Sequence, residues 1–385
     1  MKALKHLWPS ITAWDNLLLA YRKARRGKVG QASVQRFGLD LEWELAEIRQ
    51  ELLTHAYRPG HFQQFQIRDR KTRLISAAPF RDRVVHHALM GIVEPLIDRR
   101  FIDDTYASRK GKGVHAAVRR YQTWAQRYPY ALKLDVLRYF DSIDHGLLKA
   151  KLARHIADPD VLWLFNRIID HSPQPLAPHL IPQPGEDLVD LMQRPSGLPL
   201  GNLTSQFLGN FYLSDLDRHI KEVLRVPAYL RYVDDLVLLA DDKDQLWAWC
   251  KAIETFLAQE GLAVHPRKKA LYRTGLGQDI LGYRVFPGFI RLSRGSGYRF
   301  RRRLKTLAAG YGRGQLELPD INARIAGWLG HARQADAQGL SKALLAGIYC
   351  HRGEPARRAP GGSRRFVEQQ PSEPALGQPQ QEPAG

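Results

Sequence analysis

The chain has 385 residues, and its 58 Lys and Arg side chains outnumber its 39 Asp and Glu side chains, giving a formal net charge of +19. This length allows about two or three structural units with a sizeable core. The excess of positive charge excludes an ordinary neutral metabolic enzyme as the default. It favours a polyanion, and a nucleic acid in particular, as the partner.

Cysteine usage and hydropathy narrow the class of protein further. Only Cys250 and Cys350 are present, which excludes a disulfide framework and a cysteine-based zinc site. No stretch approaches the roughly 18 apolar residues that span a bilayer, and the first residues lack an apolar signal segment. We therefore expect a cytoplasmic protein with no membrane partner.

Hydrophobic periodicity predicts the elements in chain order. Helices are expected over 12–27 and 39–56, joined by a short turn, and over 82–100, 114–127, 146–157, 159–171, 202–224 and 243–260. Strands are expected in a hairpin of half-buried arms within 62–78, over 130–136, and near 262–265, 270–273 and 280–286. Asp144 is the predicted N-cap of the helix at 146–157.

Three segments stand out by composition. Residues 172–199 are rich in proline and predict a long surface connection. Residues 291–313 carry eight Lys and Arg and no acid, which predicts a basic helical region that continues to about residue 350. The last segment, 351–385, holds six Pro and five Gly, adds one net positive charge, and is predicted to be disordered.

Acidic residues follow two apolar runs of this basic chain. LKLDVLRYFDSIDH contains Asp135, and LRYVDDLVLLA carries Asp234 and Asp235 at the tip of a predicted β-hairpin. Nucleotidyl transfer uses two divalent ions about 3.5–4 Å apart, and Mg²⁺ takes oxygen ligands. We predict Asp135 and Asp234 as metal ligands and Asp235 as a weaker one, with a solvated turn as the alternative for the Asp-Asp pair.

The combination of motifs is more specific than any one of them. YVDD between two apolar strands, the DxxxxF spacing from Asp135 to Phe140, and the glycine-led segment LPLGNLTSQFLGN together resemble the palm of a reverse transcriptase. The resemblance extends from about Asn16 to Arg303.

This resemblance implies an α+β fold of the right-hand polymerase type, in which an antiparallel palm sheet has helices packed on one side. It implies N-terminal helices and fingers over 1–132, a palm with inserted fingers elements over 133–290, a basic helical thumb over 291–350, and the tail 351–385.

The family resemblance also implies roles for single residues. Two Mg²⁺ ions, for which Mn²⁺ can substitute, would be held by Asp135, Val136, Asp234 and Asp235. Lys268, in GLAVHPRKK, matches a lysine proposed to protonate the pyrophosphate leaving group.

Phe140 matches an aromatic gate against the ribose 2′-OH, with a core phenylalanine as the alternative. Its neighbour Tyr139 is the expected core residue.

Further residues are implied to contact the incoming nucleotide or the primer. Lys71 and Arg73, at the tip of the first hairpin, would clamp the triphosphate, with a solvated basic turn as the alternative. The remaining nucleotide-binding residues implied by the resemblance are Arg109, Leu200, Gly201 and Gln206, and the implied primer grip contains Gly282 and Tyr283.

The glycine-led segment departs from the general pattern. Most reverse transcriptases have Gln-Gly and then Ser-Pro, whereas this chain has Leu200-Gly201 and Ser205-Gln206. This form resembles the reverse transcriptases of diversity-generating retroelements. Loss of the amide implies that base-pair geometry is checked less strictly.

The expected function is RNA-directed DNA synthesis, with error-prone copying in a diversity-generating retroelement as the finer expectation. The expected partners are an RNA template, a DNA or RNA primer, the RNA–DNA duplex, dNTPs and a small basic helical accessory protein. A bacterial reverse transcriptase of the antiviral-defence or group II intron-like type is an alternative. A non-catalytic RNA-binding scaffold is a third, which Asp135, Asp234 and Asp235 argue against, because burying these charges without metal is costly.

Overall fold

The computed structural model describes residues 2–68, 72–173, 175, 181–182, 185–346 and 349. Lys71, much of the proline-rich connection and the tail 351–385 lie outside these residues. The chain divides into two compact units, one made of Met1–Leu281 with Phe286–Gly288 and the other of Gly282–Val285 with Phe289–Gly385.

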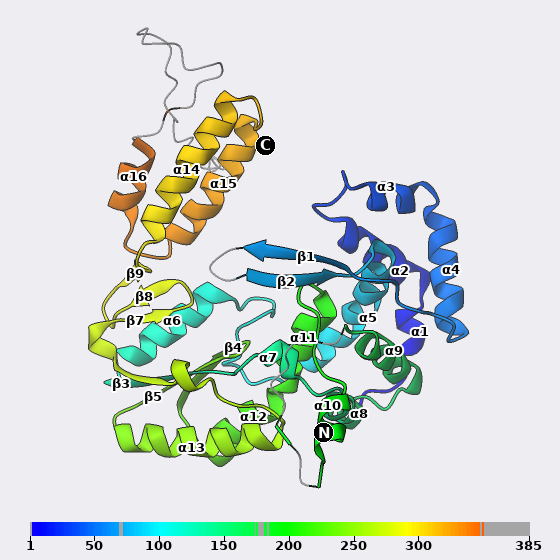
Figure 1. Cartoon of the computed structure of the whole chain (residues 1–385), viewed down its shortest axis with the longest axis horizontal. Coiled ribbons are helices and arrows are strands. Elements are labelled where there is room, and N and C mark those ends of the chain that lie inside the picture. Colours follow the sequence, from blue (N-terminus) through cyan, green and yellow to red (C-terminus); the bar gives the residue numbers. More distant parts are fainter. Residues whose placement is uncertain are drawn as a thin grey trace, which may run out of the picture. The chain divides into compact units, whose positions relative to one another are not determined.

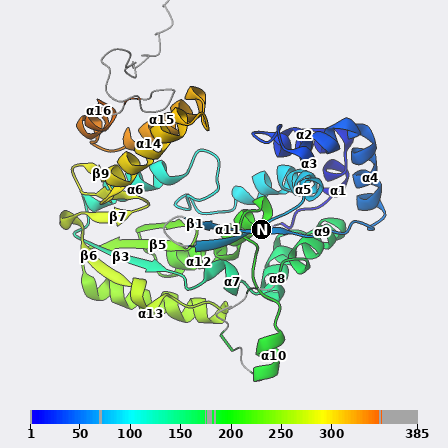
Figure 2. The same ribbon diagram turned by 45° about the horizontal axis from the view of Figure 1, so that its top comes forward.

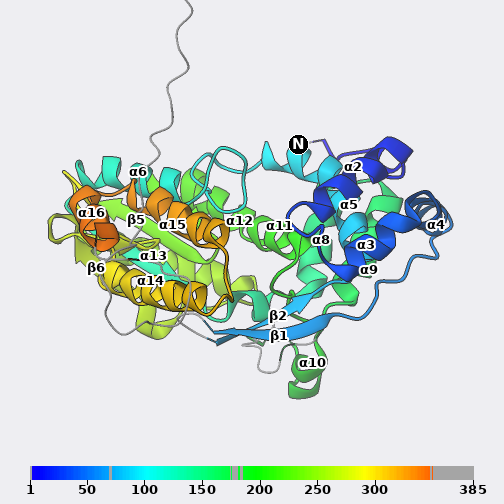
Figure 3. The same ribbon diagram turned by 90° about the horizontal axis from the view of Figure 1, so that it is seen from above.

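Helices at the start of the first unit gather around α5 (Phe80–Asp98), as Figure 3 shows. Apolar side chains of α5 are buried along its length. The helices that contact α5 are α1 (Trp8–Ile11), α2 (Trp14–Arg25), α3 (Ala32–Leu39) and α11 (Leu203–Tyr212), with α4 (Leu41–Leu53) against α2. The helices predicted at 12–27, 39–56 and 82–100 are confirmed. The short turn expected between the first two was wrong, because that segment contains α3.

The predicted hairpin within 62–78 is confirmed as β1 (Gln63–Arg68) paired antiparallel with β2 (Thr72–Ala77). It projects from the helices around α5 (Figure 1). The expectation of two half-buried arms was wrong for β1, since all six of its residues are exposed, including Phe65 at 49% and Ile67 at 46%. Among the described residues, no packed element covers β1 deeply enough to bury either face.

A four-stranded antiparallel sheet of order β4-β5-β3-β6 forms the centre of the first unit. Leu132, Leu134, Leu236 and Leu238 are wholly buried, and α13 packs against β3 and β5 (Figure 1). The bounds are β3 Tyr130–Asp135, β4 Ala228–Tyr232, β5 Asp235–Ala240, β6 Ala270–Arg273 and α13 Lys243–Gln259. The predicted mixture of helices and antiparallel strands is confirmed.

The remaining elements of the first unit lie around the sheet and the helical group. They are α6 (Val114–Ala125), α7 (Tyr139–Ser142), α8 (His145–His155), α9 (Pro159–Asp170), α10 (Leu188–Gln193), α12 (Ser214–Arg218), a π-helical turn (His219–Val223), two 3₁₀ turns (Pro266–Lys268 and Thr274–Leu276) and β7 (Gln278–Ile280). Asp144 caps α8 as predicted, its Oδ1 accepting from the Leu147 amide at 2.7 Å. The helix predicted over 202–224 is divided among α11, α12 and the π-helical turn, and residues 262–265 form no named strand.

The second unit has its own small core. Phe300 and Leu304 of α14 pack with Ile321 and Ile325 of α15, and the rings of Phe300 and Trp328 stack with centroids 3.9 Å apart. Figure 2 shows its three helices side by side. The elements are β8 (Tyr283–Val285), β9 (Ile290–Leu292), α14 (Ser296–Gly312), α15 (Leu318–Ala332) and α16 (Gln338–Ala346).

No helix among the described residues is both long enough and apolar enough to cross a membrane.

Candidate active site

The three predicted metal ligands lie at one end of the central sheet. Asp135, the last residue of β3, is the register partner of Asp235, the first residue of β5. Directly opposed residues have Cβ atoms about 4.5–5.5 Å apart and project from the same face of the sheet. Asp234 lies in the two-residue turn between β4 and β5, and its carbonyl accepts from the Val136 amide at 3.1 Å. The fold thus brings together three carboxylates from two segments about a hundred residues apart.

The turn that carries Asp234 has an unusual backbone. Val233, its first residue, has a φ of +57°, in the left-handed region that a β-branched side chain rarely adopts. Glycine is the usual residue where a two-residue hairpin turn needs positive φ at this position. Such a conformation costs on the order of 1–3 kcal/mol and persists only where the surrounding contacts impose it.

Two lysines neutralise the outer pair of carboxylates. Lys268 Nζ lies 2.5 Å from Asp135 Oδ1, and Lys133 Nζ lies 3.1 Å from Asp235 Oδ1. Among the described residues, no three His, Cys, Asp or Glu side chains converge closely enough to hold a metal ion as they stand. A metal held through these oxygens of Asp135 and Asp235 would compete with the two lysines.

Asp234 is the carboxylate without a lysine partner in the described contacts. Burial, followed by the negative charges of Asp235 and Asp135, raises the pKa of Asp234 to about 6, and Lys268 opposes this rise. Repulsion among three nearby carboxylates is the situation that a divalent cation relieves, and carboxylate oxygen is the ligand that Mg²⁺ prefers. The donor set therefore fits Mg²⁺ or Mn²⁺.

This raised pKa predicts how stability changes with pH when metal is absent. Between the ordinary value of 3.8 and about 6, the folded protein binds a proton that the unfolded chain does not, so this group adds stability as the pH falls through that range. Asp234→Asn imitates the protonated form and should be more stable than the wild type at about pH 7.5, with the difference vanishing near pH 4. Thermal unfolding of both proteins in a chelator checks this, and a constant difference across the range would contradict it.

The segment around Phe140 packs closely against α11. Tyr139 is 2% exposed and its hydroxyl donates to the Gly209 carbonyl, as expected of a core residue. Phe140 is partly buried, and a Cβ placed on Gly209 would lie 2.9 Å from its ring. The Phe140 carbonyl accepts from the Leu198 amide at 2.8 Å. This bond brings the chain leading to Leu200 and Gly201 alongside Phe140.

Leu200 and Gly201 are fastened to the first hairpin. The Leu200 carbonyl accepts from the Ser76 amide of β2 at 3.0 Å. Gly201 has a φ of +109°, and a Cβ there would lie 2.8 Å from Ile75, so only glycine fits. Asn202, which the sequence analysis did not single out, completes the junction, because its side chain accepts from the Ala78 amide and donates to the Ser76 carbonyl.

Arg109 is held by contacts with other parts of the chain. Its side chain is 9% exposed and pairs with Asp98 at 2.6 Å, and Nη1 donates to the carbonyls of Ile102 and Thr105. These contacts fasten the glycine-containing loop to the end of α5. The nucleotide contact that the resemblance implies for Arg109 stays a prediction.

The other predicted contacts are distributed as follows. Arg73 in β2 and Gln206 in α11 are exposed, and Lys71 lies outside the described residues. Gly282 and Tyr283 belong to the second unit, where the Tyr283 hydroxyl lies 2.7 Å from His331 Nδ1.

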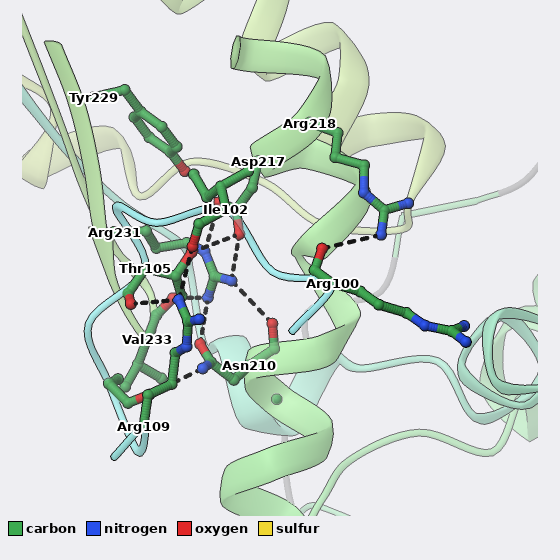
Figure 4. Close-up of polar contacts among 12 residues, drawn as sticks. Arg100, Ile102, Thr105, Arg109, Asn210, Asp217, Arg218, Tyr229, Arg231 and Val233 are labelled. Atoms are coloured by element: carbon green, nitrogen blue, oxygen red, sulfur yellow. Dashed lines mark hydrogen bonds and ion pairs between the residues drawn. The ribbon is translucent and has the colours of Figure 1, made fainter. Parts of the chain in front are cut away.

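A buried network of charged side chains lies beside the turn and was not predicted from the sequence. Arg231, the fourth residue of β4, has no exposed surface and pairs with Asp217 of α12 at 2.6 Å (Figure 4). An arginine in the middle of the apolar run AYLRYV was the available signal, because arginine is almost never fully buried unless it is paired.

A strongly basic chain that presents three aspartates at one end of an antiparallel sheet has the features of a nucleotidyl-transfer protein. The family to which the chain is similar agrees with these features. The chain belongs to the reverse transcriptase (RNA-dependent DNA polymerase) family, whose sequence profile matches residues 66–285. All three aspartates, Lys268 and the glycine-led segment fall within the matched region.

The chain is also similar to individual curated proteins, at low sequence identity and over part of its length. The chain is 27% identical over 187 residues to Protein YkfC of Escherichia coli K12, an alignment that covers 46% of each protein. It is 25% identical over 183 residues to Nuclear intron maturase 2, mitochondrial, of Arabidopsis thaliana, covering 42% of this chain and 24% of the relative. Nuclear intron maturase 1 of the same plant is 28% identical over 108 residues, covering 28% of this chain and 15% of the relative. The chain thus spans less than half the length of these curated relatives.

Proposed function

We propose that the protein is an active RNA-directed DNA polymerase that extends a primer 3′-hydroxyl by two-metal nucleotidyl transfer and releases pyrophosphate. The observation that carries this proposal is the register of the central sheet, which sets Asp135 opposite Asp235 and leaves Asp234 in the adjoining turn. A scaffold that only bound RNA would have no need of three neighbouring carboxylates in a chain of net charge +19.

The aspartates have the roles of metal ligands in this proposal. Asp135, Asp234 and Asp235 would hold Mg²⁺, with the backbone of Val136 beside them. The bound ions would supply charge stabilisation for the attacking and leaving oxygens. Lys268, displaced from Asp135, would have its Nζ available to donate a proton to the departing pyrophosphate.

The residues around the glycine-led segment would form the nucleotide site. Phe140 packs on Gly209, and its backbone is bonded to the segment that contains Leu200 and Gly201. Arg73 is an exposed residue of β2, the strand to which the Leu200 carbonyl is also hydrogen-bonded. Its guanidinium can donate two hydrogen bonds to a triphosphate. Lys71 and Gln206 are kept as proposed contacts on the resemblance alone.

Template, primer and duplex would be held largely through phosphates. The basic helix α14 carries Arg and Lys side chains without an acid between Ser296 and Gly312. An RNA–DNA hybrid is close to A-form, so we propose that the second unit contacts its phosphates and minor-groove sugars, with Gly282 and Tyr283 near the primer.

Phe140→Val tests the gate against ribonucleotides. Removing the ring leaves space where a 2′-hydroxyl would otherwise collide, so preference for dNTPs over rNTPs should fall by at least about tenfold. Phe140→Tyr keeps the ring and should keep the preference. Incorporation of each nucleotide class on one primed RNA template measures the ratio, and an unchanged ratio in Phe140→Val would leave Phe140 as a packing residue only.

Within the family, we propose an intron-associated type, because two of the relatives described above are named as intron maturases. A diversity-generating retroelement enzyme is the second candidate, favoured by Leu200-Gly201 and Ser205-Gln206. Two measurements separate these types. An excess of cDNA errors opposite template adenines, in the presence of a small basic accessory protein, supports the retroelement type. Stimulation of splicing in a separate assay with an intron RNA supports the intron type.

The activity itself is tested with purified full-length protein, Mg²⁺, dNTPs and a primed RNA template. Extension of the primer, abolished by a chelator and restored by Mg²⁺, is the expected result. RNA binding without extension under either Mg²⁺ or Mn²⁺ would favour the non-catalytic scaffold.

A further inference from the structure

The guanidinium of Arg231 is fixed from two sides. Nε donates to Asp217 Oδ1 at 2.8 Å and Nη2 donates to Asp217 Oδ2 at 2.6 Å (Figure 4). Nη2 also donates to the carbonyl of Asn210 at 2.9 Å, and Nη1 donates to its Oδ1 at 3.0 Å. A two-pronged arginine–carboxylate pair fixes the plane of the guanidinium as well as its position.

The partners of Arg231 are themselves anchored. Asp217, which has no exposed surface, accepts hydrogen bonds from the Tyr229 hydroxyl at 2.7 Å and from Thr105 Oγ1 at 3.1 Å. Asn210 of α11 donates to the Ala107 carbonyl at 2.9 Å. The network therefore ties β4 to two helices and to the segment that pairs with the outer edge of β4.

One donor of this network points to the catalytic turn. Arg231 Nη1 also donates to the carbonyl of Val233 at 3.0 Å. Val233 is the residue with the left-handed backbone, and the next residue is Asp234. A contact to the carbonyl restrains the peptide that joins them. The buried ion pair thus reaches the one strained position in the turn.

We propose that Arg231 is a positioning residue that holds the Val233–Asp234 peptide in the orientation that presents the Asp234 carboxylate to metal. This inference rests on the proposed function, since it assumes that Asp234 binds a divalent ion. Buried ion pairs often contribute little net stability compared with apolar side chains of the same volume, so stability alone gives no reason for arginine at this position. The contact of Arg231 with the Val233 carbonyl gives such a reason.

The test compares Arg231→Lys and Thr105→Val with the control Lys151→Gln, using Mn²⁺ alone as the probe. Lys151 is also buried and paired with two carboxylates, Asp215 and Glu260, but makes no contact with the turn among its described interactions. Mn²⁺ affinity is read by electron paramagnetic resonance, and Mg²⁺ dependence by primer extension, at a temperature where each variant is folded by circular dichroism.

Loss of support around metal ligands typically weakens binding by about 10- to 100-fold, and we expect a loss of this size for Arg231→Lys. Thr105→Val removes one hydrogen bond to Asp217 and should weaken Mn²⁺ binding by about threefold. If Arg231→Lys does not fold, the Mn²⁺ affinity of Thr105→Val tests the proposal instead. Lys151→Gln should lower the melting temperature and leave Mn²⁺ affinity unchanged.

Unchanged Mn²⁺ affinity in folded Arg231→Lys would overturn the inference, and so would an equal loss in Lys151→Gln. Mn²⁺ binding that is insensitive to Asp234→Asn would overturn it as well, because the turn would then hold no metal. If Arg231→Lys weakens Mn²⁺ binding although the wild type extends no primer, the positioning role stands and the proposed polymerase activity fails.

Discussion

Asp234→Asn is expected to reduce primer extension by at least about a thousandfold, because a catalytic metal ion contributes several kcal/mol and each 1.4 kcal/mol is a factor of ten in rate. The change is nearly isosteric and removes the carboxylate whose pKa is raised by burial and by the charges of Asp235 and Asp135. The fold should survive it, since removal of a repelled charge favours the folded state. Single-turnover extension of a primed RNA template measures the loss.

Another Asp-Asp pair, Asp241–Asp242, directly follows β5 and provides the matched control. Asp241 is exposed at the other end of β5, and Asp241→Asn should leave the extension rate within about twofold of the wild type, as for surface substitutions in general. Full activity of Asp234→Asn in saturating Mg²⁺ would remove Asp234 from the metal site.

Arg231→Met is expected to lower the free energy of unfolding by about 3–5 kcal/mol, because it leaves Asp217 buried without its cation. Asp217 has no exposed surface, so water cannot replace the lost partner. The double variant Arg231→Met/Asp217→Leu should recover most of that loss, since no unpaired charge remains. Urea unfolding measures all three free energies.

An exposed ion pair serves as the comparison for this loss. Lys149 of α8 pairs with Asp170, whose side chain is 55% exposed, and Lys149→Met should cost less than about 1 kcal/mol. A double variant no more stable than Arg231→Met would mean that the shape of the network, rather than the unpaired charge, sets the loss.

Local signals predicted much of this molecule. The apolar runs on both sides of YVDD specified β4 and β5, and the apolar run before Asp135 specified β3. Asp144 capped its helix for the reason its position suggested. These features depend on neighbours within a few residues, which a sequence displays directly. The pairing of β3 with β5 joins segments about a hundred residues apart and was not predicted.

Contacts that depend on distant partners were not predicted. Arg109, in a basic loop, pairs with Asp98 and donates to the carbonyls of Ile102 and Thr105. Asp104, which follows another aspartate in the sequence, is 4% exposed and pairs with Arg120 and Lys221. Which charges meet in a fold is decided by packing between segments far apart in the chain, and a single sequence does not contain that information.

The pairs Lys268–Asp135 and Lys133–Asp235 would couple the binding of metal to the binding of triphosphate at the proposed site. A divalent ion held by these carboxylates at the proposed site would weaken their pairing with the two ammonium groups, and these cations would then attract polyphosphate. Metal and triphosphate should therefore bind with positive thermodynamic coupling, each raising the affinity for the other by the same factor.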